Sequence, residues 1–187
     1  RDACGLEPCP RHHAVTDWIE TNQKEMGPVV SQGLDDALVF DLSAASPEID
    51  DLDRVLDPEK FSKDLVRRLE DADATVGIGR YAEPRMWYAS DSYGQAAGEF
   101  PERRTVHTAI DVFLPAGSPV LAPLEGRVLS LKHNSDRLDY GPTIILKHAP
   151  EGGPTFYTLY GHLTEESLEG SEVGSPVERG QEIAQLG

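Results

Sequence analysis

The spacing of apolar residues predicts two helices in the first half of the chain. Val15, Trp18 and Ile19 recur on one face at helical spacing, so we predict a helix over residues 15–24. A second helix is predicted over residues 59–70, where a proline stands at the start and apolar positions again recur at helical spacing. The stretches around both helices are polar and rich in turn residues, which is typical of loops.

Short apolar runs predict strands beside the second helix and throughout the second half of the chain. Residues 38–42 and 75–81 suit strands, and the acidic, proline-interrupted stretch 43–57 is predicted to be a loop. Later runs, separated by Pro and Gly, cover residues 85–89, 106–114, 119–122, 127–133, 143–148, 155–162 and 182–186. Many short strands with turns between them predict a compact antiparallel β domain.

We therefore predict an α+β fold that is mainly β. Residues 1–72 are expected to form a small N-terminal α/β appendage or linker with the two helices, and residues 73–187 the antiparallel β domain. A chain of 187 residues, 39% of them hydrophobic, can bury a core of that size.

The charge balance limits the classes of expected partner, and the cysteine count bears on the expected compartment. The formal net charge is -16, from 33 acidic against 17 basic residues, which disfavours binding to nucleic-acid phosphates or to an anionic membrane surface. No apolar run approaches the roughly 18 residues needed to cross a bilayer. Cys4 and Cys9 are too few for a disulfide framework, so a cytoplasmic location is favoured.

His107 and Asp111 are the first candidates for chemistry. Histidine and aspartate are both preferred zinc ligands, at about 2.0–2.2 Å from the ion, so two of them on one ion lie only about 3 Å apart. Four residues of an extended strand span about 13 Å, and the pair can share an ion only if the chain turns or bulges between them. The same spacing occurs in His13 and Asp17, which we interpret as a histidine beside the start of the first helix and an acidic residue in its first turn.

The segments that follow give His107 and Asp111 a context. They read Ala-Pro-Leu-Glu-Gly-Arg-Val at 122–128, Tyr-Gly-Pro-Thr-Ile-Ile-Leu-Lys-His at 140–148, Tyr-Gly-His-Leu at 160–163 and Gly-Gln-Glu-Ile-Ala-Gln-Leu-Gly at 180–187. This succession resembles the M23 family of zinc metallopeptidases, the lysostaphin and LytM type with the duplicated-hybrid-motif β fold. The resemblance covers about residues 100–187.

The resemblance implies a zinc site and its residues. In the family, the His-x-x-x-Asp motif supplies two zinc ligands, which correspond to His107 and Asp111, and the histidine of the Tyr-x-His-Leu motif, which corresponds to His162, acts in the active site. The third zinc ligand and a further histidine come from a His-x-His motif, which we expect beyond Gly187. The β domain is therefore expected to be truncated at its C-terminal end, and this segment alone to bind zinc weakly and to be a poor enzyme.

The implied activity is hydrolysis of peptide bonds by a zinc-activated water, with short peptides containing glycine or D-alanine as substrates. A histidine is expected as general base, because the chain has no His-Glu-x-x-His helix. A second resemblance rests on the segment Cys-Gly-Leu-Glu-Pro-Cys-Pro at 4–10, Trp18, the acidic loop, and residues 81–85 and 104–107. With these features the chain resembles the middle of large bacterial proteins, in which an M23-like domain lies between an aminoglycoside-phosphotransferase-like domain and a class III, pyridoxal-phosphate-dependent aminotransferase.

Other interpretations stay open. The β domain can be a non-catalytic scaffold that contacts neighbouring domains of a multidomain aminotransferase. It can be a biotinyl- or lipoyl-type carrier, although the expected hairpin lacks the lysine that such a carrier needs. Gly126, Gly161 and Gly180 can also be simple turn residues, with His107 and His162 as partly buried strand residues.

The remaining cysteines and histidines carry weaker signals. Cys4, Cys9, His12 and His13 can form a small zinc site, or the two cysteines can form a disulfide or stay free thiols. For His133 and His148 we predict surface or hydrogen-bonded structural roles.

Overall fold

The computed structural model describes residues 10–47, 49, 51, 55–89, 94–95, 102–103, 105–136 and 138–187. The chain divides into two compact units: the sheet unit, from Arg1–Ser31 and Ala116–Gly187, and the central unit, from Gln32–Pro115. Cys4, Cys9 and the side chain of His12 lie outside the described residues. The small zinc site near the N-terminus and its alternatives therefore stay predictions.

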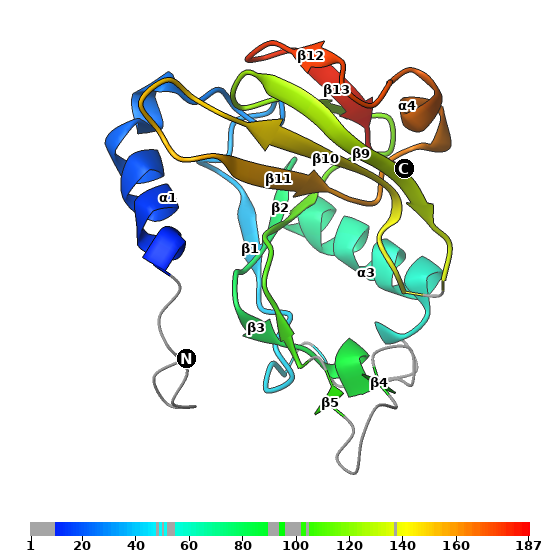
Figure 1. The fold of residues 1–187 in the computed structure, drawn as a ribbon. Coiled ribbons are helices and arrows are strands. Elements are labelled where there is room, and N and C mark those ends of the chain that lie inside the picture. The colour runs from blue at the N-terminus through cyan, green and yellow to red at the C-terminus, as the bar shows by residue number, and fades with distance from the viewer. Residues whose placement is uncertain are drawn as a thin grey trace. The chain divides into compact units, whose positions relative to one another are not determined.

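A four-stranded antiparallel sheet forms the centre of the sheet unit (Figure 1). Its strand order is β11 (Phe156–Tyr160), β10 (Gly141–His148), β9 (Gly126–Asn134) and β12 (Pro176–Val177). Ile144, Leu146 and His148 alternate along β10 and are fully buried, because successive side chains of a strand point to opposite faces of the sheet. One face of this sheet therefore carries the core.

Shorter elements complete the core of the sheet unit. β8 (Pro119–Leu121) pairs with β13 (Glu182–Gln185), and α4 (Glu165–Glu169) contacts β10 and β13. The buried apolar side chains of this core are Val120, Ala122, Val128, Ile144, Leu146, Leu163, Val177, Ile183 and Ala184.

The first helix, α1 (Pro10–Thr21), belongs to the sheet unit and is followed by the 3-10 helix Gln23–Glu25. The ring of Trp18 lies 5.9 Å from the ring of Phe156 at the start of β11. Further on, the Gly27 backbone N–H donates to the carbonyl of Pro123 at 2.7 Å. The N-terminal segment is thus part of this unit's packing.

The predicted start of the first helix is wrong. The helix begins at Pro10 rather than at residue 15, because the first helical position tolerates a residue without a backbone N–H. Asp17 consequently lies beyond the first turn of the helix, and the first turn contains no acidic residue. The helix-dipole interpretation of His13 and Asp17 is therefore wrong as well.

The central unit contains a three-stranded sheet and α3 (Pro58–Asp71). β2 (Gly77–Gly79) lies between β1 (Leu38–Phe40), to which it is parallel, and β7 (Asp111–Phe113), to which it is antiparallel. Asp57 caps α3 by accepting a hydrogen bond from the Lys60 backbone N–H at 3.2 Å. The core side chains are Phe40, Leu42, Ile49, Val55 and Leu65.

Pairs of short strands extend the central unit. β3 (Glu83–Pro84) pairs with β6 (Val106–His107), and β4 (Gly94–Gln95) pairs with β5 (Glu102–Arg103). The strand predicted over residues 106–114 is thus found as two strands, β6 and β7, with a break between them.

The prediction of a strand over residues 85–89 is wrong. β3 ends at Pro84, and the 3-10 helix Met86–Ala89 follows. A short apolar run does not by itself distinguish a strand from a helical turn. Here Trp87 packs edge-on against Phe61 of α3, with ring centroids 5.2 Å apart, and this contact favours the turn.

The predicted fold class, α+β and mainly β with antiparallel pairing, is confirmed. The division into an appendage over residues 1–72 and a β domain over residues 73–187 stays a prediction. None of the helices within the described ranges has the length and apolar character needed to cross a bilayer.

Candidate metal centre

His107 and Asp111 lie on an antiparallel ribbon whose two strands are interrupted at matching positions. Glu83 of β3 is opposite His107 of β6, and Gly79 of β2 is opposite Asp111 of β7. Gly79 and Glu83 are four positions apart, as are His107 and Asp111, so the register is the same on both sides of the interruption. Both strands leave the ladder together and rejoin it together.

The interruption brings the His107 and Asp111 side chains together. Nε2 of His107 lies 3.6 Å from Oδ1 of Asp111. An uninterrupted strand would hold these two positions about 13 Å apart, so the bend that a shared ion requires is present. The His107 side chain is 12% exposed and that of Asp111 24%, so both are largely shielded from bulk water.

The pair fits two corners of a tetrahedral zinc site. Ligand atoms about 2.0–2.2 Å from one tetrahedral ion lie about 3.4 Å from each other. The observed 3.6 Å is close to that value, and imidazole nitrogen and carboxylate oxygen are donor types that zinc takes. Within the part of the chain that the structure describes, no three His, Cys, Asp or Glu side chains are grouped to hold an ion. Among the described residues, His107 and Asp111 are therefore the two candidate ligands.

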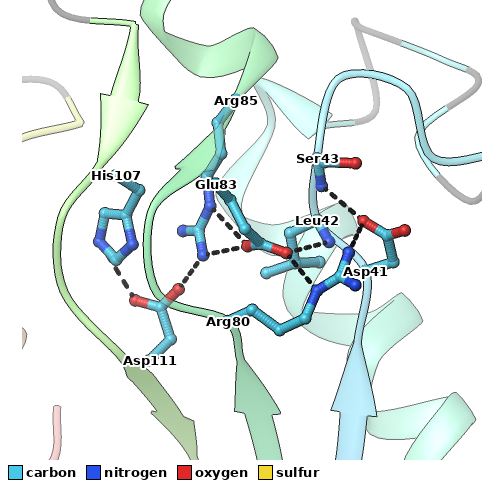
Figure 2. Close-up of polar contacts among 8 residues, drawn as sticks. All are labelled: Asp41, Leu42, Ser43, Arg80, Glu83, Arg85, His107 and Asp111. Atoms are coloured by element: carbon cyan, nitrogen blue, oxygen red, sulfur yellow. Dashed lines mark hydrogen bonds and ion pairs between the residues drawn. The ribbon is translucent and has the colours of Figure 1, made fainter.

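Arg85 contacts the second oxygen of Asp111. Its Nη2 lies 2.6 Å from Oδ2 of Asp111, and the same guanidinium donates to Oε2 of Glu83 from Nε at 3.2 Å and from Nη2 at 2.8 Å. Figure 2 shows Asp111 between His107 and Arg85, with one carboxylate oxygen toward each. The Arg85 and Glu83 side chains are only 8% and 5% exposed, so this ion pair is buried.

Glu83 is held by a further set of donors. Its Oε1 accepts hydrogen bonds from the Leu42 backbone N–H at 3.2 Å and from Nε of Arg80 at 3.0 Å. Each carboxylate oxygen of Glu83 therefore has two donor groups, which satisfies a buried charge. Arg80 also forms an ion pair with Asp41. Hydrogen bonds to Asp41, the larger effect from Ser43 and the smaller from Arg80, lower the pKa of Asp41 below its ordinary value.

Glu83 and Arg85 are the parts of this centre that the sequence-based interpretation does not predict. Arg85 contacts Asp111, and Glu83 contacts Arg85. These contacts depend on the pairing of β2 with β7 and of β3 with β6, which joins segments far apart in the chain. The one local signal is a glutamate between two arginines, Arg80 and Arg85, which is typical of a compact set of paired charges.

His162 belongs to the sheet unit and follows β11. Its φ is +56°, a left-handed conformation that few non-glycine residues adopt. Its backbone N–H donates to the carbonyl of Tyr140 at 2.7 Å, and its carbonyl accepts from the Gly187 N–H at 2.9 Å. The side chain is exposed. Its predicted action in the active site stays a prediction.

His148 and His133 have the kinds of role predicted for them. The fully buried His148 ring has Nδ1 2.8 Å from the carbonyl of Glu125 and Nε2 2.9 Å from Oγ1 of Thr158. Because a carbonyl only accepts, Nδ1 carries a proton and donates it to the Glu125 carbonyl. His133 is 43% exposed and lies 3.7 Å from Oε1 of Glu165 at the surface.

Comparison with known proteins gives a family assignment for the C-terminal part. A search of curated proteins and a search of solved structures each returned no match. Residues 105–187 match the family model described as peptidase family M23, and this segment includes His107, Asp111 and His162. The chain therefore carries, at residues 105–187, a domain of peptidase family M23.

Proposed function

We propose that the M23 domain is a zinc-dependent peptidase in which His107 and Asp111 hold the metal ion. The observation that carries the proposal is the 3.6 Å between Nε2 of His107 and Oδ1 of Asp111, the separation that two ligands of one ion require. Both residues lie in the segment that matches the family. A third protein ligand is expected from the His-x-His motif of the family.

The roles of the side chains follow from their chemistry. His107 would bind through its imidazole Nε2 and Asp111 through Oδ1, so one ligand is neutral and the other anionic. A zinc ion bound there would supply Lewis-acid activation of water and of the scissile carbonyl. We propose that a ring nitrogen of His162 forms a hydrogen bond with the water that attacks the peptide. The Tyr-x-His-Leu motif and the exposure of the His162 side chain support this role.

Peptides that contain glycine or D-alanine are the proposed substrates. The net charge of -16 favours neutral or cationic peptides over acidic ones, because like charges repel. A cytoplasmic location and a place among neighbouring domains of a longer bacterial protein stay part of this proposal and rest on the sequence resemblance.

The proposal is tested in the full-length natural protein by measuring zinc content and peptide hydrolysis. His107→Ala and Asp111→Ala are each expected to reduce zinc occupancy and to abolish hydrolysis. His13→Ala is the matched control, since His13 also has an aspartate four residues on but lies in α1. Unchanged zinc content in His107→Ala would overturn the proposal. Full zinc occupancy without hydrolysis of any tested peptide would favour the non-catalytic scaffold instead.

A further inference from the structure

We infer that Arg85 is a positioning residue for Asp111 and that Glu83 holds Arg85 in place, so that Oδ1 of Asp111 is the oxygen offered to the metal ion. The inference rests on the proposed metal-binding role of His107 and Asp111. Arg85 and Glu83 lie outside the segment that matches family M23, so the family assignment says nothing of them.

The first step concerns the two oxygens of Asp111, which have different neighbours. Oδ1 lies 3.6 Å from Nε2 of His107, whereas Oδ2 lies 2.6 Å from Nη2 of Arg85. The terminal torsion of an aspartate is soft, and a free carboxylate binds cations through one oxygen or both. With Oδ2 engaged by Arg85, the carboxylate is restrained to offer Oδ1 alone, which suits a four-coordinate zinc site.

The second step concerns Glu83, which makes a cationic neighbour compatible with a metal ligand. A lone guanidinium 2.6 Å from a ligand oxygen would repel a divalent cation beside it. Oε2 of Glu83 accepts two hydrogen bonds from Arg85, which offsets that charge and orients the guanidinium plane. The negative charge of Asp111 therefore remains available to a cation.

The third step concerns rigidity. Glu83 is itself fixed by the Leu42 backbone N–H and by Nε of Arg80. A continuous set of contacts thus runs from the backbone of Leu42, which follows β1, to the carboxylate of Asp111 (Figure 2). Partners of this kind orient metal ligands in proteins, and their loss typically lowers metal affinity about 10- to 100-fold.

Positioning and simple electrostatics make opposite predictions for one variant. Arg85→Met removes a positive charge beside the proposed ligand, so charge alone would tighten cation binding. Positioning predicts instead that affinity falls by about 10- to 100-fold. In the double variant Arg85→Met/Glu83→Gln the net charge equals that of the wild type, and affinity is expected to be as low as in Arg85→Met. The introduced amide keeps an oxygen that can accept from Leu42 and Arg80.

The experiment measures the affinity of the full-length natural protein for Zn²⁺ by competition with a chromophoric chelator. The visible absorption of Co²⁺ bound in place of Zn²⁺ reports the coordination geometry. Both variants are expected to bind Zn²⁺ more weakly and to give an altered Co²⁺ spectrum. Arg85→Lys, which keeps the charge but lacks the planar fork that contacts Asp111 and Glu83 together, is expected to be intermediate. Wild-type or tighter affinity in Arg85→Met or in the double variant would overturn the inference.

His107→Ala separates this inference from the proposed function. If His107→Ala binds Zn²⁺ like the wild type, the metal-binding role fails, and the positioning role fails with it. If His107→Ala loses Zn²⁺ while the Arg85→Met variants keep wild-type affinity, the metal-binding role stands and only the positioning role fails. Should Arg85→Met not fold, Arg85→Lys decides: wild-type affinity and an unchanged Co²⁺ spectrum would overturn the inference.

Discussion

Gly79 lies directly opposite Asp111 in the pairing of β2 with β7, and a Cβ on Gly79 would stand 2.7 Å from Oδ2 of Asp111. It would also stand 3.1 Å from Nη2 of Arg85. Carbon and oxygen atoms do not approach to 2.7 Å without repulsion, so a side chain here would displace the carboxylate. The lack of a side chain at Gly79 leaves the space in which Asp111 and Arg85 meet.

Gly79→Ala is therefore expected to weaken Zn²⁺ binding without changing any charge. The new methyl group pushes Oδ2 of Asp111 away from Arg85, and we expect affinity to fall by about tenfold, as for other losses of ligand support. Competition with a chelator measures it. Gly33→Ala is the matched control in the same unit, because nothing lies within 4 Å of a Cβ there. Equal affinities in the two variants would show that the carboxylate position does not matter.

His148→Ala is expected to destabilise the sheet unit by about 2–4 kcal/mol. The substitution empties a fully buried position and removes the hydrogen-bond partner of the Glu125 carbonyl and the Thr158 hydroxyl. Urea unfolding monitored by circular dichroism measures the change. His133→Ala, at the surface, is expected to stay within about 0.5 kcal/mol of the wild type. Similar losses in the two variants would contradict a structural role specific to His148.

Ile144→Ala is expected to cost about 2–5 kcal/mol of unfolding free energy, because Ile144 is 0% exposed in the core of the sheet unit. Leu159→Ala on the neighbouring strand β11 is the control. Its side chain is 50% exposed, and the expected loss is below about 0.5 kcal/mol. Chemical denaturation checks both values. A larger loss in Leu159→Ala than in Ile144→Ala would mean that the buried face of the sheet has been assigned wrongly.

Asp41 is expected to make the stability of the central unit depend on pH. Hydrogen bonding from Ser43 and Arg80 lowers its folded pKa, so its stabilising effect is complete above the unfolded pKa of about 3.9 and is lost as pH falls through the folded value. Asp41→Asn is thus expected to unfold at lower urea concentration than the wild type at pH 7. The difference should shrink below about pH 4.

Urea titrations at neutral pH and at about pH 3 test this prediction. Asp35→Asn, which changes an exposed carboxylate in the same unit, is the control for the general loss of one negative charge. An equal difference between Asp41→Asn and the wild type at both pH values would assign the effect to something other than the charge of Asp41.

Local patterns predicted the elements whose formation depends on residues close together in the chain. The helix predicted over residues 59–70 is found as Pro58–Asp71, since its cap, its first-turn proline and its apolar spacing are all local. The strand predicted over residues 85–89 was wrong because a short apolar run suits either a strand or a helical turn. The contact between Trp87 and Phe61, which the local pattern does not contain, favours the turn.

For the candidate metal centre, the sequence by itself determined the types of the candidate ligands and their spacing at His107 and Asp111. Their distance in space was decided by the tertiary structure. The backbone of a regular strand rises about 13 Å over four residues, whereas across the observed bend Nε2 of His107 lies 3.6 Å from Oδ1 of Asp111. The support from Glu83 and Arg85 was also decided there. It depends on the register between strands far apart in the chain, which a local pattern does not encode.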